Sequence, residues 1–219
     1  MRTFQHFQYA LLLFSVIQAC SPQQSVDREA VKNELASREI KRISQSERME
    51  KGLEMGKQIA AAAQQALQKN LKGAIDKGGM EYALTYCNQH ALFLVKELED
   101  SLSVDIMRVS QKFRNPKDEP DSLENLILDA YQYSLDNGLT VEPAIMEDGK
   151  EVLLFTQPIL ISNTLCLTCH GAIGTDISEE NYDTILGYYP KDSATGYAMG
   201  QLRGMWAIRI PTKTIVNSL

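Results

Sequence analysis

Histidine and cysteine are scarce in this sequence, which has three histidines and four cysteines among 219 residues. Neither a second Cys-x-x-Cys pair nor a His-x-x-x-His pair is present to complete a tetrahedral zinc site around the one Cys-x-x-Cys pair. The sequence also lacks a G-x-x-x-x-G-K-[ST] loop and a G-x-G-x-x-G turn, so nucleotide binding has no support. The 28 acidic residues outnumber the 22 basic ones and give a net charge of −6, so nucleic acid is not an expected partner.

Three of these seven residues lie within one stretch of five, CLTCH, at residues 166–170. Two thiols separated by two residues and followed at once by a histidine form the C-x-x-C-H signature of covalent haem attachment. In this interpretation Cys166 and Cys169 add across the vinyl groups of one haem c, and His170 is the proximal iron ligand. A thioredoxin-like redox site is the alternative, but no βαβ pattern surrounds the pair and that role gives the histidine no function.

The N-terminus, MRTFQHFQYALLLFSVIQACS, has the parts of a bacterial export signal. Its apolar stretch, residues 9–17, is too short to span a bilayer as a helix. The segment IQAC that ends at Cys20 resembles a lipobox, which implies a signal peptide at 1–19 and lipid on the Cys20 thiol. An ordinary signal peptide with an incidental Cys20 is the alternative. We expect a membrane-anchored protein on the periplasmic side, and Ser21 favours the outer membrane of a Gram-negative cell.

Hydrophobic spacing predicts a polar tether at 20–36 and an α+β domain at 37–219, with an antiparallel sheet. The first half is expected to contain helices at 37–71 and 80–100 with a glycine break between them, a strand at 104–113 and a helix capped by Asp121 or Ser122. The second half is expected to contain strands at 140–146 and 151–162 joined by a turn at 146–150, a short helix or turn at 178–186, a loop at 188–204 and a strand at 205–210. Pro158 indicates an edge or a bulge in its strand. The long N-terminal helix either packs on its own domain or pairs with a second copy in a homodimer.

Cys87 is the cysteine that neither lipid nor haem accounts for. It lies three residues before His90 on the helix expected at 80–100, so the two side chains share neighbouring parts of one helix face. A lone thiol in an oxidising compartment is buried and inert, paired with another chain, or used in chemistry.

Three stretches carry a resemblance to a known family: RVSQKFRNPKDEPDSLE (108–124), PILISNTLCLTCHG (158–171) and YYPKDSATGYAMGQLRGMWAIRIP (188–211). They resemble the single-haem c-type family that was first catalogued as a domain of unknown function. Its members occur alone or joined to bacterial sensor kinases and cyclases. The resemblance covers roughly residues 50–212 and implies a PAS-like fold, an antiparallel sheet flanked by helices, with one covalently bound haem.

The resemblance also implies that Cys87 is the second axial ligand, because family members have a cysteine in a segment similar to ALTYCNQHA. Ferric iron stabilises a thiolate, and an anionic sulfur ligand favours the ferric state, so a low reduction potential is expected. The alternatives for this ligand are His90 and the methionines Met80, Met107, Met146, Met199 and Met205.

Further candidate residues flank the haem motif. Arg108 and Arg114 are predicted to pair with the haem propionates, since a guanidinium matches a carboxylate in a two-pronged contact. Solvated strand charges are the alternative for both arginines. The loop residues expected to cover the haem edge, or only to shape a turn, are Pro190, Asp192, Thr195, Gly196 and Tyr197.

Three functions remain open from the residues and the resemblance together. A haem with both axial positions filled suits a sensor of redox state or of a small gas, which would act through a separate partner protein because no kinase or cyclase segment follows residue 219. A lipid-anchored single-electron carrier between periplasmic partners needs no such output. A haem peroxidase would need an open iron site and a distal acid–base residue. His90 is the only histidine available for that distal role, so we expect that the protein is not an enzyme.

Overall fold

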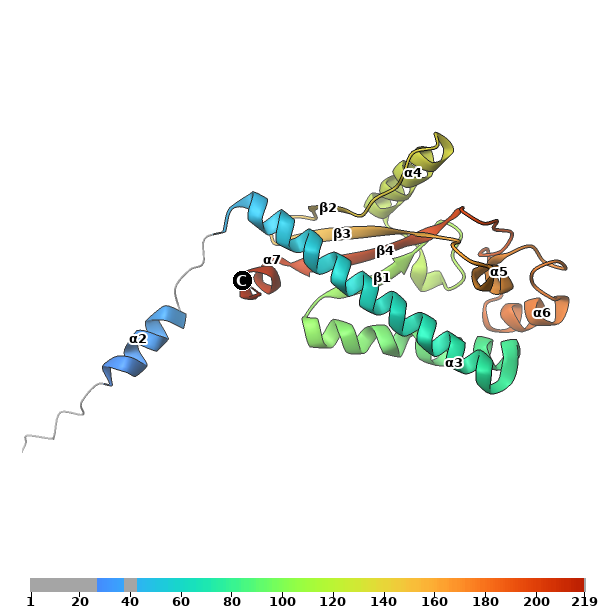
Figure 1. Ribbon diagram of the computed structural model, residues 1–219, viewed down its shortest axis with the longest axis horizontal. Helices are drawn as coiled ribbons and strands as arrows, with labels where there is room; N and C mark the ends of the chain where they lie inside the picture. The colour runs from blue at the N-terminus through green and yellow to red at the C-terminus, as the bar shows by residue number, and fades with distance from the viewer. Residues whose placement is uncertain (1–26, 38–42, 219) are drawn as a thin grey trace, which may run out of the picture. The chain divides into compact units, whose positions relative to one another are not determined.

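The computed structural model describes residues 27–37 and 43–218 (Figure 1). The chain divides into two compact units at residue 42. In the first unit, helix α2 (Arg28–Ser37) lies where the tether was expected, and its residues 28–34 are all exposed. The predicted signal peptide at 1–19 and the lipidation site Cys20 lie outside the described residues. Within the two described ranges, no helix has both the length and the apolar character needed to cross a bilayer.

The second unit is built on a four-stranded antiparallel sheet with the order β1-β4-β3-β2. The strands are β1 (Asp105–Val109), β2 (Ala144–Glu147), β3 (Val152–Leu160) and β4 (Leu202–Pro211). The long strands β3 and β4 form the centre, where Phe155 pairs with Ile208. The predicted α+β class with an antiparallel sheet is confirmed.

Helix α3 (Gln45–Leu102) covers one face of this sheet as two arms (Figure 1). It begins at a capping box formed by Ser44, and it bends at Gly78 and Gly79, whose backbone is not helical. Gly79 has a φ of 70°, which a residue with a side chain rarely adopts. The two predicted helices are therefore the two arms of α3, while residues 38–42 lie outside the description.

Side chains alternate between the two faces of the sheet and create a separate apolar core on each. The core under α3 contains Ile59, Ala60, Ala63, Val104, Ile106, Leu153, Phe155, Trp206, Ile208, Ile210 and Ile215. The core on the opposite face packs against helix α4 (Ser122–Asp136) and contains Val109, Ile127, Leu128, Tyr131, Leu154, Met205 and Ala207.

The remaining short elements lie at the two ends of the sheet. Helices α5 (Thr164–His170) and α6 (Glu179–Tyr188) lie at one end, and α7 (Thr212–Asn217) lies at the other (Figure 1). A single 3₁₀ turn, η1 (Pro116–Asp118), follows β1. Helices α5 and α7 were not predicted, because seven and six residues are too few to display helical spacing.

Several predicted strand boundaries are corrected by the structure. The strand expected at 104–113 ends at Val109, because the chain turns there and the Ser110 hydroxyl lies 2.7 Å from the carbonyl oxygen of Arg203. The strand expected at 140–146 begins only at Ala144, and the one expected at 205–210 extends to 202–211.

Pro158 has no backbone N–H to donate, and it lies where β3 is paired with a strand on one side only. It pairs with Met205 of β4, but the ladder between β2 and β3 has already ended at the Ala144–Thr156 pair. Its other side is therefore an unpaired edge, and the register shifts directly afterwards, between Ile159 and Leu160. The edge or bulge predicted at this proline is confirmed.

The close contact between α3 and the sheet depends on Gly56. A Cβ atom at this position would lie 2.2 Å from a ring carbon of Phe155, which is fully buried. We expect Gly56→Ala to lower the free energy of unfolding by about 1–3 kcal/mol, because overpacking outweighs the gain in helix propensity. Urea denaturation would measure this loss. Gly73→Ala is the matched control, since its Cβ would meet nothing within 4 Å, and stabilisation by about 0.5–1 kcal/mol is expected there.

Candidate functional site

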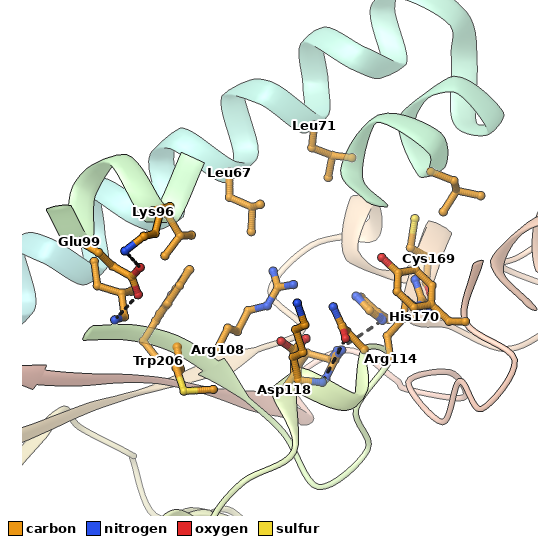
Figure 2. A pocket seen from close by; sticks show the side chains of 18 of the residues that line it. Leu67, Leu71, Lys96, Glu99, Arg108, Arg114, Asp118, Cys169, His170 and Trp206 are labelled. Carbon is orange, nitrogen blue, oxygen red and sulfur yellow. Dashed lines mark hydrogen bonds and ion pairs between the residues drawn. The ribbon is translucent and has the colours of Figure 1, made fainter. Parts of the chain in front are cut away.

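A cavity of about 520 Å³ lies between the arms of α3 and the sheet. Its volume is within the range of about 300–1,000 Å³ that is usual for cofactor and ligand pockets. Figure 2 shows Leu67 and Leu71 extending into it from the first arm of α3, with Arg108 opposite them. Cys169 and His170 line one end of the cavity, so the predicted haem motif meets a space of suitable size.

Helix α5 holds the motif residues together. Its N-cap residue Asn163 accepts a hydrogen bond from the backbone N–H of Cys166, at 3.3 Å. Residues three and four positions apart share one helix face, so Cys166, Cys169 and His170 lie on the same side. Both cysteines are free thiols, and the Cys169 sulfur is 3.6 Å from the sulfur of Met80 on α3. Burial raises the pKa of the Cys169 thiol.

The His170 ring is held in one tautomer. Its Nδ1 atom lies 2.7 Å from the carbonyl oxygen of Ala194 and 3.3 Å from Nε of Arg203. One nitrogen cannot donate to the carbonyl and accept from the guanidinium, and the shorter contact requires the proton on Nδ1. Burial, together with the charges of Arg203 and Arg114, holds the pKa of His170 well below its usual value. A neutral ring with its proton on Nδ1 presents the Nε2 lone pair to a metal.

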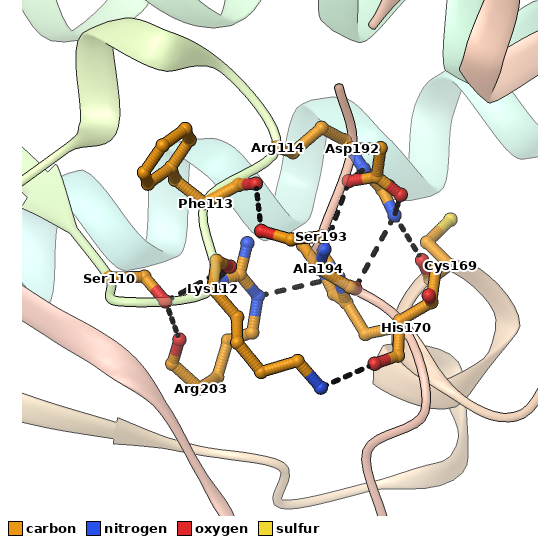
Figure 3. A network of polar contacts seen from close by, with 11 residues as sticks. Ser110, Lys112, Phe113, Arg114, Cys169, His170, Asp192, Ser193, Ala194 and Arg203 are labelled. Carbon is orange, nitrogen blue, oxygen red and sulfur yellow. Dashed lines mark hydrogen bonds and ion pairs between the residues drawn. The ribbon is translucent and has the colours of Figure 1, made fainter. Parts of the chain in front are cut away.

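A buried ion pair supports the carbonyl that contacts His170 (Figure 3). The Arg114 guanidinium lies 3.0 Å from the Asp192 carboxylate, whose side chain is fully buried, and it donates to the Cys169 carbonyl at 2.6 Å. The same carboxylate accepts a hydrogen bond from the backbone N–H of Ala194. Arg114 thus joins the haem motif to the loop that orients His170. It also lines the large cavity, and its contact with a propionate stays a prediction.

Tyr197 lies beside His170 but does not itself line the large cavity. Its backbone N–H donates to the His170 carbonyl at 2.9 Å, and the Gly196 N–H donates to the Gly171 carbonyl at 2.8 Å. The Tyr197 ring meets the His170 ring edge to face, with centroids 6.3 Å apart. It is not among the described residues that line the large cavity, so it packs against His170 and does not cover the cavity.

The polar part of the large cavity contains residues that the sequence interpretation overlooked, among them Arg203 and Asp118. Arg203 lines the cavity with Arg108, Arg114 and Asp118. Burial is the main reason that the pKa of Arg203 falls to about 10, and the neighbouring charges of Arg108 and Arg114 lower it further. Burial also raises the pKa of Asp118, against the attraction of Arg108 and Arg203. The only sequence signal for Arg203 was a charge at the start of an apolar strand.

The structure locates the helix of the proposed second ligand but not its side chain. Cys87 and His90 lie on the second arm of α3, and the side chains of residues 87–94 are outside the description. Of the alternatives, Met107 lines the large cavity and Met80 contacts Cys169. Met146 and Met205 pack in the core under α4, and Met199 is exposed. Among the described residues, no cluster of three metal-ligating side chains forms a separate metal site.

The fold and the site together define an α+β domain with a four-stranded antiparallel sheet and a cavity beside a C-x-x-C-H helix. The Tll0287-like family model matches residues 23–211, and the chain belongs to this family. The structure is similar to the crystal structure of the cyanobacterial heme-protein Tll0287, with a TM-score of 0.53 and 26% identity over 72% of this chain and 94% of that one. Curated proteins provide no match. The family resemblance and the fold class inferred from sequence are confirmed.

Proposed function

We propose that the chain holds one haem c through Cys166 and Cys169, with His170 as the proximal ligand, and senses redox state or a small gas. The observation that carries the proposal is the His170 ring, oriented by the Ala194 carbonyl, which lines the 520 Å³ cavity together with the free thiol of Cys169, while the free thiol of Cys166 lies one turn earlier on the same helix. The similar crystal structure is that of a heme-protein, which supports the same cofactor here. A bound haem would supply an iron centre whose oxidation state and axial ligand can change.

Cys87 is our proposed second axial ligand. It follows Ala83 by four residues and Leu84 by three, and both of these line the large cavity. Helical spacing assigns Cys87 to their face of the second arm of α3. With both axial positions filled, the iron has no open position for a substrate, which favours sensing over an enzyme. The break at Gly78 and Gly79 separates this arm from the first, so a change of ligand would act on one arm.

The proposed output and location follow from the sequence. Lipid on Cys20 would anchor the domain on the periplasmic side of a bacterial membrane, where c-type haem is attached. A separate partner protein would receive the signal, and a homodimer would form through the helix expected at 37–71, whose described part is the first arm of α3. Mass spectrometry of the membrane fraction would show whether the mature chain begins at a diacylated Cys20.

Single-electron transfer is the second candidate function, and one observation favours it. Leu165 and Ile173 flank the haem motif, and each is 38% exposed. Exposed apolar side chains beside a haem edge suit the brief contact of a redox partner. Reversible reduction without a change of ligand would support this alternative, whereas a ligand change on reduction would support sensing.

Electron paramagnetic resonance tests the proposed ligands directly. In the ferric form of residues 21–219, made in cells that attach c-type haem, we expect a low-spin signal with a small g spread. Cys87→Ala should abolish this signal because it removes the sulfur ligand, and His90→Ala is the matched control that should keep it. A signal that survives Cys87→Ala would refute the thiolate ligand. A high-spin resting signal would favour an enzyme with an open iron site.

A further inference from the structure

A second cavity, of about 300 Å³, lies on the Tyr197 side of His170. It is lined by Ser110, Gln111, Lys112, Leu128, Gln132, Gly196, Tyr197, Gln201, Leu202, Arg203 and Gly204. Most of these residues offer amide, hydroxyl or cationic groups, and the volume is at the lower end of the range for ligand pockets. A small polar ligand is therefore the class of molecule that it can hold.

The charged side chains that line the second cavity are both positive. Lys112 and Arg203 are its charged residues, and neither Asp nor Glu is among the described residues around it. The Lys112 ammonium donates to the Thr195 carbonyl at 2.7 Å, and Arg203 Nη1 donates to the Lys112 carbonyl at 3.2 Å. Within the described part of the chain, no carboxylate lies within ion-pair distance of either cation. An anion with oxygen acceptors would contact two cations, each of which has further N–H groups beyond those used in these hydrogen bonds.

Two groups connect this cavity to the proximal histidine. Arg203 lines both cavities, and its Nε atom is 3.3 Å from His170 Nδ1. Tyr197 places its ring against His170 and lies under the Lys112 ammonium, which is 4.3 Å from the ring centroid. A charge added between Lys112 and Arg203 would therefore act close to the side of His170 that faces away from the iron.

We propose that the second cavity binds a small carboxylate or oxoanion, and that this anion tunes the redox state of the haem site. The regulatory part rests on the proposed function. A negative charge beside the proximal histidine stabilises the ferric state more than the ferrous state, so it lowers the midpoint potential. By linkage, the ferric protein binds the anion more tightly by the same free energy. Tenfold tighter ferric binding corresponds to a shift of about 59 mV for one electron.

Calorimetry and electrochemistry on the haem-loaded protein test both parts. Acetate and phosphate serve as probes at constant ionic strength, and the absorption spectrum is recorded first to show that haem is attached. We expect saturable binding of at least one probe, weakened at least about tenfold in Lys112→Met, which removes a charged donor. Lys191→Met removes the same charge from an exposed residue outside both cavities, and should bind as the native protein does. The bound anion should lower the midpoint potential in the native protein and in Lys191→Met.

The outcomes separate the site from the proposed function. Absence of saturable binding, or equal binding in Lys112→Met, would overturn the anion site. Binding with an unchanged midpoint potential would overturn the regulation. A spectrum without covalent haem would refute the proposed function and with it the regulation, while calorimetry on the same sample would still decide the anion site.

Discussion

Arg209→Met is expected to lower the free energy of unfolding by about 3–5 kcal/mol. The Arg209 guanidinium binds three carboxylates: Asp148 and Glu124 at 2.8 Å each, and Asp121 at 2.6 Å. Glu124 is 2% exposed, so its charge cannot be solvated once the arginine is removed. The methionine would keep most of the apolar volume but leave a buried carboxylate without a cation, which is the costly way to break an ion pair.

Urea denaturation of Arg209→Met would measure this loss, with Arg48→Met as the matched control. Arg48 pairs with Glu147, whose side chain is 45% exposed, so that pair is screened by water and its loss should cost less than about 1 kcal/mol. Adding Glu124→Gln to Arg209→Met should restore part of the stability, because it removes the unpaired charge. Equal losses in the two arginine variants would refute the role assigned to the buried carboxylate.

The sequence predicts those parts of the fold whose signals are local. Apolar stretches bounded by turn residues revealed the strands, and the helix start predicted at Asp121 or Ser122 is where the structure has a capping box between Asp121 and Glu124. The same signal at Ser44 and Glu47 was passed over, because the apolar pattern was extended upstream to residue 37. The continuation of α3 through Gly73 also differs from the expectation, because the contacts of a long helix outweigh the modest propensity cost of one glycine.

The candidate site also has one part that the sequence shows locally and another part that only the folded chain brings together. The C-x-x-C-H motif is contiguous, so its chemistry is visible from spacing alone. The groups that orient His170 come from distant parts of the chain: Ala194 lies 24 residues away and Arg203 lies 33 residues away. Arg114 was identified as a candidate, but its partner Asp192 is 78 residues away and was expected to cover the haem edge or to shape a turn, not to pair with this arginine. Such pairs are set by tertiary packing, for which one sequence gives no local signal.

Asp192→Ala is the second change for which we expect a large effect, because it should loosen the haem site as well as the fold. The Asp192 side chain is fully buried, and it neutralises Arg114, which is itself only 13% exposed. It also accepts a hydrogen bond from the Ala194 N–H, so it holds the loop whose carbonyl fixes the His170 tautomer. Its removal should lower the free energy of unfolding by about 3–5 kcal/mol, since Arg114 would be left buried without a counter-charge.

Two measurements separate the effect of Asp192→Ala on stability from its effect on the site. Urea denaturation gives the stability, and the ratio of covalent haem to protein, with the ferric spectrum, reports on the site under the proposed function. Asp183→Ala, on the exposed face of α6, is the control and should change neither. Asp192→Asn keeps an oxygen that accepts a hydrogen bond from the Ala194 N–H, but it removes the negative charge that neutralises Arg114. It should therefore preserve the orientation of His170 better than it preserves the free energy of unfolding. If Asp192→Ala lost stability but kept the native haem ratio and ferric spectrum, the Ala194 loop would not be what orients the proximal histidine, and α5 alone would have to fix its position.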